Sequence, residues 1–193
     1  AVAGVLTLGA VIALNSKTME HGKKSTDPQI GQIFFEKELV MGAEKIEISK
    51  GEQQLKLAKD SNGLWMIQGK PPFLARPDKI KDLLSDALEV KAERLVGMKK
   101  SQFNSLGLGP ESLRLKISKG EKSTVLLNGD RREKGEGQYI AFENAEKSYV
   151  SNKTFHLNPE AKNWESKKPF LWKSAEVSEL ELNVLGSEKL AIK

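Results

Sequence analysis

Cysteine is absent from the 193 residues of the chain. Its absence excludes disulfide bridges, thiolate metal sites and a cysteine nucleophile, but it leaves the compartment of the protein open. Three of the commonest uses of a reactive sulfur atom are therefore ruled out before any motif is considered.

Histidine is nearly absent as well, with His21 and His156 the only two in the chain. They are the candidates for a base at neutral pH, but His21 lies in a polar stretch and His156 has the character of a partly packed surface histidine. Neither metal-ligand spacing, nor a nucleophile elbow, nor a carboxylate pair in apolar surroundings accompanies them. We expect no catalytic residue, no metal site and no cofactor, with hydrolysis by His156 as the least favoured hypothesis.

Aromatic residues make up only 6% of the chain, and they are not interleaved with the lysines. The stacking platforms typical of nucleic-acid-binding proteins are therefore missing, and no nucleic-acid partner is expected. The formal net charge is +5, but lysines and glutamates are mixed along the chain. This pattern favours a solvated surface over an electrostatic patch for anionic lipid.

The amino-terminal stretch, residues 1–14, is uncharged and mostly apolar. As a helix it would be about 21 Å long, whereas a membrane span takes about 20 residues. We interpret residues 1–15 as a truncated transmembrane helix, in preference to the hydrophobic part of a signal peptide or a buried core helix, because the run is apolar all round. The expected anchor side chains are Val2, Val5, Leu6, Leu8, Val11, Ile12 and Leu14.

Residues 16–31 are polar, and we expect them to form a tether between the membrane and a folded region. The folded α+β module is expected to cover residues 32–176, and a last hairpin to cover residues 177–193. The composition thus predicts an anchor, a tether and one main folded unit.

Alternating apolar and polar residues predict three β-hairpins, starting at residues 45, 113 and 180. The first two share the identical string ISKGE, at residues 48–52 and 117–121, where each hairpin is expected to turn. Residues 64–67 and the pair 138–142 and 147–150 are predicted to be further strands. The repetition indicates either an internal duplication or chance similarity among alternating strands.

Residues from Pro77 onward place apolar side chains on one stripe of an amphipathic helix, which is expected to end between Lys91 and Arg94. The predicted fold class is α+β: an antiparallel, hairpin-built sheet covered by this one main helix, with repeated modules and an N-terminal membrane helix. The expected structural core contains Ile46, Ile48, Trp65, Ile80, Leu83, Leu84 and Leu88.

Two loops have the composition of a phosphate site without its pattern. Residues 106–110 (LGLGP) lack the spacing of a phosphate loop and a following helix, and we interpret them as a turn. Arg131 and Arg132 lie in a polar connection and could hold a phosphate, but no Walker lysine accompanies them.

The order of these segments resembles the bacterial envelope family called domain of unknown function 4340. The resemblance runs through residues 45–49, 63–65, 76–88, 106–110, 148–151, 169–171 and 178–182. It implies an amino-terminal membrane helix, an inner-membrane location and a soluble domain in the periplasm, often with repeated modules. Many members are encoded beside gliding-motility-type ABC transporters, and residues 177–193 would then start a second module.

The leading functional hypothesis is a non-enzymatic, membrane-anchored accessory or scaffold subunit of an ABC-type transporter complex. Its partners would be integral-membrane transporter subunits and, through the N-terminal helix, the lipid bilayer. The alternative is an envelope module that recognises glycan or peptide, either at an exposed sheet edge or at the connection between Trp164 and Trp172.

Overall fold

The computed structural model describes residues 27–167, 180–182 and 190–192. The expected membrane anchor, most of the expected tether and the aromatic residues Phe170 and Trp172 lie outside these ranges. Among the described residues, no helix has both the length and the apolar composition that crossing a membrane requires.

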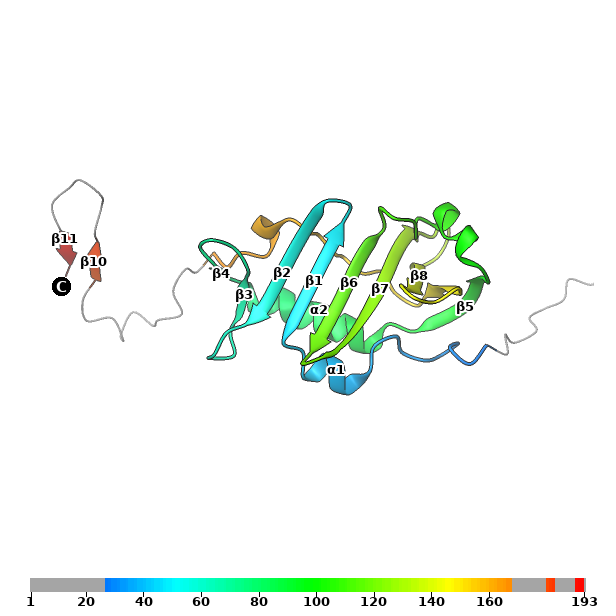
Figure 1. The fold of residues 1–193 in the computed structure, drawn as a ribbon, viewed down its shortest axis with the longest axis horizontal. Helices are drawn as coiled ribbons and strands as arrows, with labels where there is room; N and C mark the ends of the chain where they lie inside the picture. The colour runs from blue at the N-terminus through cyan, green and yellow to red at the C-terminus, as the bar shows by residue number, and fades with distance from the viewer. Residues whose placement is uncertain (1–26, 168–179, 183–189, 193) are drawn as a thin grey trace, which may run out of the picture.

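A nine-stranded antiparallel sheet dominates the described part of the chain, in the order β4-β3-β2-β1-β6-β7-β8-β9-β5 (Figure 1). Together with two α-helices, it confirms the predicted α+β class. The strands are β1 Lys45–Lys50, β2 Gln53–Lys59, β3 Trp65–Ile67, β4 Phe73–Leu74, β5 Ala92–Gly97, β6 Leu113–Lys119, β7 Lys122–Arg131, β8 Gln138–Phe142 and β9 Ser148–Ser151.

Two four-stranded meanders meet at the middle of this sheet. Strands β1 to β4 extend to one side and β6 to β9 to the other, and β1 pairs with β6 so that Ile46 faces Ile117. The repeated ISKGE string ends the first strand of each meander, and Gly51 and Gly120 occupy the same turn position with φ of 56° and 55°. The sequence repeat thus has a structural counterpart in two equivalent hairpins.

Helix α2, Pro77–Glu89, covers one face of the sheet (Figure 1). It buries Ile80, Leu83 and Ala87, while Leu84 and Leu88 are half-buried and pack against the same core. The helix ends before the predicted region of Lys91 to Arg94, because Ala92–Gly97 instead forms the edge strand β5 beside β9. Strand pairing therefore overrides the helical tendency of this segment.

The core beneath α2 is formed by the apolar residues that alternate along the strands. Ile46 and Ile48 are buried there, as are Phe34 and Phe35 from the segment before the short helix α1, Lys37–Met41. Trp65 is only half-buried against this core, so it does not fill the centre as expected; instead its ring lies 5.3 Å from Lys59 Nζ.

Residues 27–31, predicted as the end of the tether, belong to the folded unit. Ile30 forms a bridge with Ala92, and the Asp27 carboxylate contacts Lys147 and Tyr149. The folded region therefore begins at least five residues earlier than the predicted boundary at residue 32.

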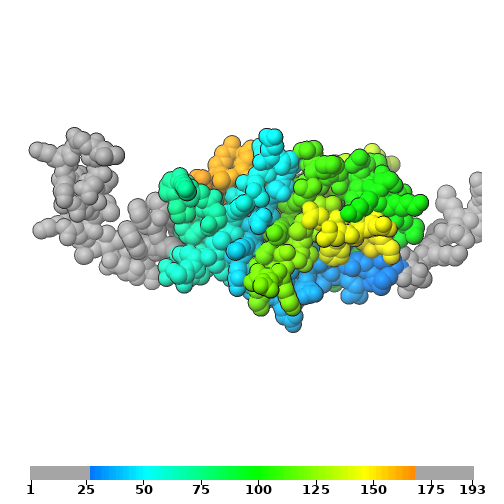
Figure 2. All heavy atoms as spheres, viewed as in Figure 1, coloured from blue at the N-terminus to red at the C-terminus, as the bar shows by residue number. Residues whose placement is uncertain are grey.

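The face of the sheet opposite α2 has two parts. A small apolar cluster of Phe103, Leu108, Leu127 and Ala141 lies under the 3-10 turns η1, Lys100–Gln102, and η2, Asn104–Leu106. Over β2, β1 and β6 the described residues place no helix, and the side chains of these strands reach the surface (Figure 2).

The last predicted hairpin is present as strands β10, Leu180–Leu182, and β11, Leu190–Ile192. The two strands pair antiparallel, with Leu180 opposite Ile192. They form a two-stranded sheet that is separate from the nine-stranded one.

Candidate functional site

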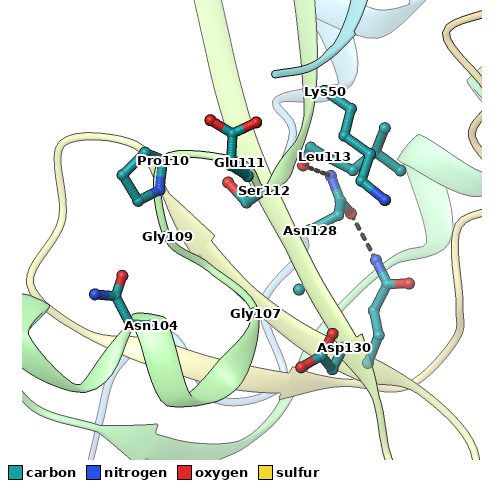
Figure 3. A pocket seen from close by; sticks show the side chains of 12 residues that line it. Lys50, Asn104, Gly107, Gly109, Pro110, Glu111, Ser112, Leu113, Asn128 and Asp130 are labelled. Atoms are coloured by element: carbon teal, nitrogen blue, oxygen red, sulfur yellow. Dashed lines mark hydrogen bonds between the residues drawn. The ribbon is translucent and has the colours of Figure 1, made fainter.

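A pocket of about 500 Å³ lies where β6 begins, β7 ends and β8 begins (Figure 3). The loop that follows η2 forms one wall, and the strand residues Leu113, Asn128 and Gln138 line the pocket with it. This volume falls within the range of small-molecule sites.

The wall loop approaches β7 closely at Gly129. A Cβ atom on Gly129 would lie 2.1 Å from the carbonyl oxygen of Leu106, a backbone atom that no side-chain movement can clear. Leu108 from the same loop is buried in the small apolar cluster. The loop is therefore fixed on both sides, and the shape of the pocket is set by packing.

Two buried amides, Asn128 and Gln138, form a rigid part of the lining. Gln138 Nε2 donates to Asn128 Oδ1 at 2.6 Å, and Asn128 Nδ2 donates to the carbonyl oxygens of Leu126 at 3.0 Å and Leu113 at 3.4 Å. Because every polar atom of the Asn128 side chain has a partner, this residue holds the lining in place and has little capacity left for a ligand.

Ser112 differs from these amides because its hydroxyl has no partner. The residue is 5% exposed, and its Oγ atom makes no hydrogen bond with any described residue. Leaving a buried hydroxyl unpaired costs about 1–3 kcal/mol. A hydroxyl that lines a pocket in this state is suited to bind a polar group of a ligand. Ser148 Oγ is also buried and unpaired, but it does not line this pocket.

Charged groups surround the same pocket. Lys50, Glu111 and Asp130 line it and are exposed, and none of the three has an ion pair with another described residue. The lining thus offers one ammonium group, two carboxylates and an unpaired hydroxyl. Such a set suits binding of a polar ligand by hydrogen bonds.

Sequence reasoning missed Ser112, Asn128 and Gln138. It noted the neighbouring loop at residues 106–110 but interpreted it only as a turn. The available signal was a polar residue within an apolar strand: Asn128 follows Leu126 and Leu127, and Gln138 starts the strand QYIAF. Ser112 gave no signal, because its burial depends on the fold of the loop.

The residues singled out from the sequence lie elsewhere. His156 is exposed, and its Nδ1 atom is 3.3 Å from Arg131 Nη2, beside Arg132 at a second cavity. Trp164 is 3% exposed, and its indole N–H donates to the Asn158 carbonyl oxygen at 2.7 Å. The structure therefore brings together Arg131, Arg132 and His156, which the sequence analysis treated separately. The ring of Trp164 is too deeply buried to form an exposed platform on which a ligand could stack.

No group of three or more histidine or acidic side chains in the described ranges is arranged to hold a metal ion. The comparisons with known proteins give one result. A model of the family described as "Domain of unknown function (DUF4340)" matches residues 65–193, which is more than half of the chain. The match leaves out the first hairpin, which the sequence resemblance included. No curated protein and no solved structure matches the chain.

Proposed function

The chain belongs to the family described as domain of unknown function DUF4340, and we propose that it is a non-enzymatic, membrane-anchored accessory or scaffold subunit of an ABC-type transporter complex in the bacterial inner membrane. Family membership is the observation that carries this proposal, because the family resemblance implies a membrane helix followed by a periplasmic domain. The partners would be integral-membrane subunits of the transporter.

The start of the folded unit supports a position close to the bilayer. The apolar run ends at Leu14 and the folded unit includes Asp27, so residues 15–26 join them. Twelve residues span at most about 43 Å when fully extended. A domain on so short a connection would stay within reach of the membrane-proximal parts of neighbouring subunits.

The open face of the sheet offers a surface for such contacts. On β1, β2 and β6 the residues that alternate with the core are polar except for Ala58, and Lys116 and Glu47 lie 3.8 Å apart there. Arg114 and Glu143 form a similar pair at 3.8 Å. Exposed ion pairs contribute little to stability, so these charges are available to select a partner.

A charge placed in the apolar run tests the anchor. Leu8→Lys adds a charge that costs about 2.5–3.5 kcal/mol at the centre of a membrane helix, and Ser16→Lys adds the same charge outside the run. We expect the wild-type chain and Ser16→Lys to sediment with membranes after a high-salt wash, and Leu8→Lys to lose much of this association. Equal recovery of wild type and Leu8→Lys in the soluble fraction would rule out the anchor.

A second function, a ligand-binding module of the envelope for glycan or peptide, is favoured by the unpaired Ser112 hydroxyl. The pocket in Figure 3 takes the place of the Trp164 region that the sequence suggested, since Trp164 is buried. Binding of an N-acetylglucosamine tetrasaccharide or a dialanine peptide, weakened by Ser112→Val, would support this function. Equal affinities of wild type and Ser112→Val for these ligands would contradict the ligand-binding function of this pocket.

A further inference from the structure

A second cavity, of about 480 Å³, lies on the other side of the connection between β7 and β8. Asp130 and Gln138 line the first pocket, whereas their chain neighbours Arg131 and Gly137 line the second. The two cavities share no lining residue. The second one is therefore a separate feature of the molecule, and a ligand bound in it would not depend on the proposed function.

The lysine that lines this cavity, Lys153, is already paired with two carboxylates. Lys153 Nζ lies 2.8 Å from Asp86 Oδ1 and 2.9 Å from Glu89 Oε2, both on α2. The hydrogen bond to Lys153 holds the pKa of Glu89 below its ordinary value, and the hydrogen bonds to Asp86 and Glu89 raise the pKa of Lys153. Lys153 is thus committed to the helix and is not free to attract a ligand.

Arg131 and Arg132 carry the positive charge that remains. Neither guanidinium has a carboxylate partner within residues 27–167, although the lining includes Glu136. The lining residues Arg131, Arg132 and Lys153 stand against Asp86 and Glu136, and Glu89, which lies outside the lining and binds Lys153, brings the sum to zero, so the positive charge is local to the two arginines.

Both guanidiniums are held in position by contacts that use only part of their hydrogen-bonding capacity. Arg131 Nη2 lies 3.3 Å from His156 Nδ1, and Arg132 Nη1 donates to the Glu136 carbonyl oxygen at 3.2 Å. Each guanidinium has five N–H donors, so most of them remain for a ligand. Arginine has no hydrogen-bond acceptor, so in this contact the guanidinium of Arg131 is the donor.

We propose that this cavity binds the oxyanion group, phosphate or carboxylate, of a small molecule. Two positioned guanidiniums match the planar, paired oxygen atoms of such groups and bind them through charge-assisted hydrogen bonds. A neighbouring cavity of about 320 Å³ shares Asp86 and His156 with this one and is lined by Phe155 and Trp164. The rest of the ligand would extend toward that cavity, with the oxyanion on Arg131 and Arg132.

The test measures binding of inorganic phosphate and of benzoate to the full chain in detergent, by calorimetry at low ionic strength. Arg131→Gln/Arg132→Gln is compared with Lys81→Gln/Lys122→Gln, which removes the same charge from exposed positions outside the cavity. Circular dichroism checks that all three proteins are folded. We expect wild type and the lysine variant to bind alike, and the arginine variant to bind at least tenfold more weakly.

The two probe ligands show which kind of oxyanion, phosphate or carboxylate, the cavity binds. Arginine-dependent binding of phosphate alone assigns a phosphate group, and arginine-dependent binding of benzoate assigns a carboxylate beside an apolar ring. The proposal is overturned if wild type binds neither ligand, if the arginine variant binds as well as wild type, or if the lysine variant loses binding to the same degree.

Discussion

Asp27 Oδ2 accepts a hydrogen bond of 2.7 Å from Lys147 Nζ, between residues 120 positions apart in the chain. The carboxylate also accepts a hydrogen bond of 3.2 Å from the Tyr149 hydroxyl and one of 3.0 Å from the backbone N–H of Gln29. These contacts fasten the segment that precedes the first helix to the beginning of β9. The end of any membrane connection is therefore fixed to the edge region of the sheet.

Replacing Asp27 should loosen this attachment. Asp27→Ala removes a charge-assisted hydrogen bond from a side chain that is 5% exposed, and we expect a loss of about 1–3 kcal/mol in the free energy of unfolding. Urea denaturation measures the change. Glu146→Ala, next to Lys147 and exposed, is the matched control and should change stability by less than about 0.5 kcal/mol. Equal stability of Asp27→Ala and wild type would show that the contact does not hold the segment.

The Asp27 carboxylate should also make the free energy of unfolding depend on pH in the acid range. The hydrogen bond from Lys147 lowers the pKa of Asp27 in the folded protein from its ordinary value of 3.8. The stability it contributes is complete above pH 3.8 and is lost as the pH falls through the lower folded value. The difference in unfolding free energy between wild type and Asp27→Ala should therefore shrink on acidification below about pH 4. A difference that stays constant down to about pH 2 would contradict the lowered pKa.

Tyr149 should ionise only at high pH. Burial, and then the nearby Asp27 carboxylate, raise the pKa of the Tyr149 hydroxyl from 10.0 to about 12. Its contribution to stability is complete below pH 10 and is lost as the pH rises through about 12. The chain has two tyrosines, so Tyr139→Phe leaves Tyr149 alone for titration by absorbance at 295 nm. Ionisation near pH 10 while circular dichroism still shows the folded protein would refute the prediction.

Ser112 and Ser151 provide a matched pair of buried serines. Ser151 Oγ accepts the N–H of Gln138 at 3.1 Å and donates to the Lys153 carbonyl oxygen at 2.6 Å, whereas Ser112 Oγ has no partner among the described residues. Without ligand, Ser151→Ala should lose about 1–3 kcal/mol, and Ser112→Ala should be unchanged or more stable by up to about 1 kcal/mol. Thermal unfolding compares them. A loss in Ser112→Ala as large as that in Ser151→Ala would mean that this hydroxyl serves the fold.

Leu83 lies on the buried face of α2, and its neighbour Leu84 lies at the edge of that face. Sequence periodicity placed both in the core, but Leu83 is 5% exposed while Leu84 is half-buried. Leu83→Ala should cost about 2–5 kcal/mol because it leaves a cavity under the helix, and Leu84→Ala should cost roughly half as much. Similar losses for both, measured in urea, would contradict the orientation of the helix.

Periodicity alone predicted the parts of the fold that depend on local pattern. The start of α2 at Pro77, the turns at Gly51 and Gly120 and the pairing of β8 with β9 follow from proline and glycine chemistry and from apolar alternation. The edge strands β4 and β5 were missed. Each is short or carries charged residues, and it becomes a strand only because a neighbouring strand lies beside it.

The candidate sites were less predictable because they depend on contacts between distant segments. Ser112 is buried by the loop before β6, and Asp27 is held by residues more than a hundred positions away. Arg131 and His156 were each noted, but nothing in the spacing of the two residues indicated that the fold brings them within 3.3 Å. Sequence patterns report the neighbours along a helix or strand, and these sites are made by neighbours across the fold.

The central claim, that the chain is an accessory subunit of a membrane transporter, is tested most directly by its partners. The full chain, cross-linked in bacterial cells and purified from their membranes in mild detergent, should be recovered with the permease and ATPase subunits of an ABC-type transporter. Recovery of the chain as a monomer, with no integral-membrane protein attached, would contradict the claim.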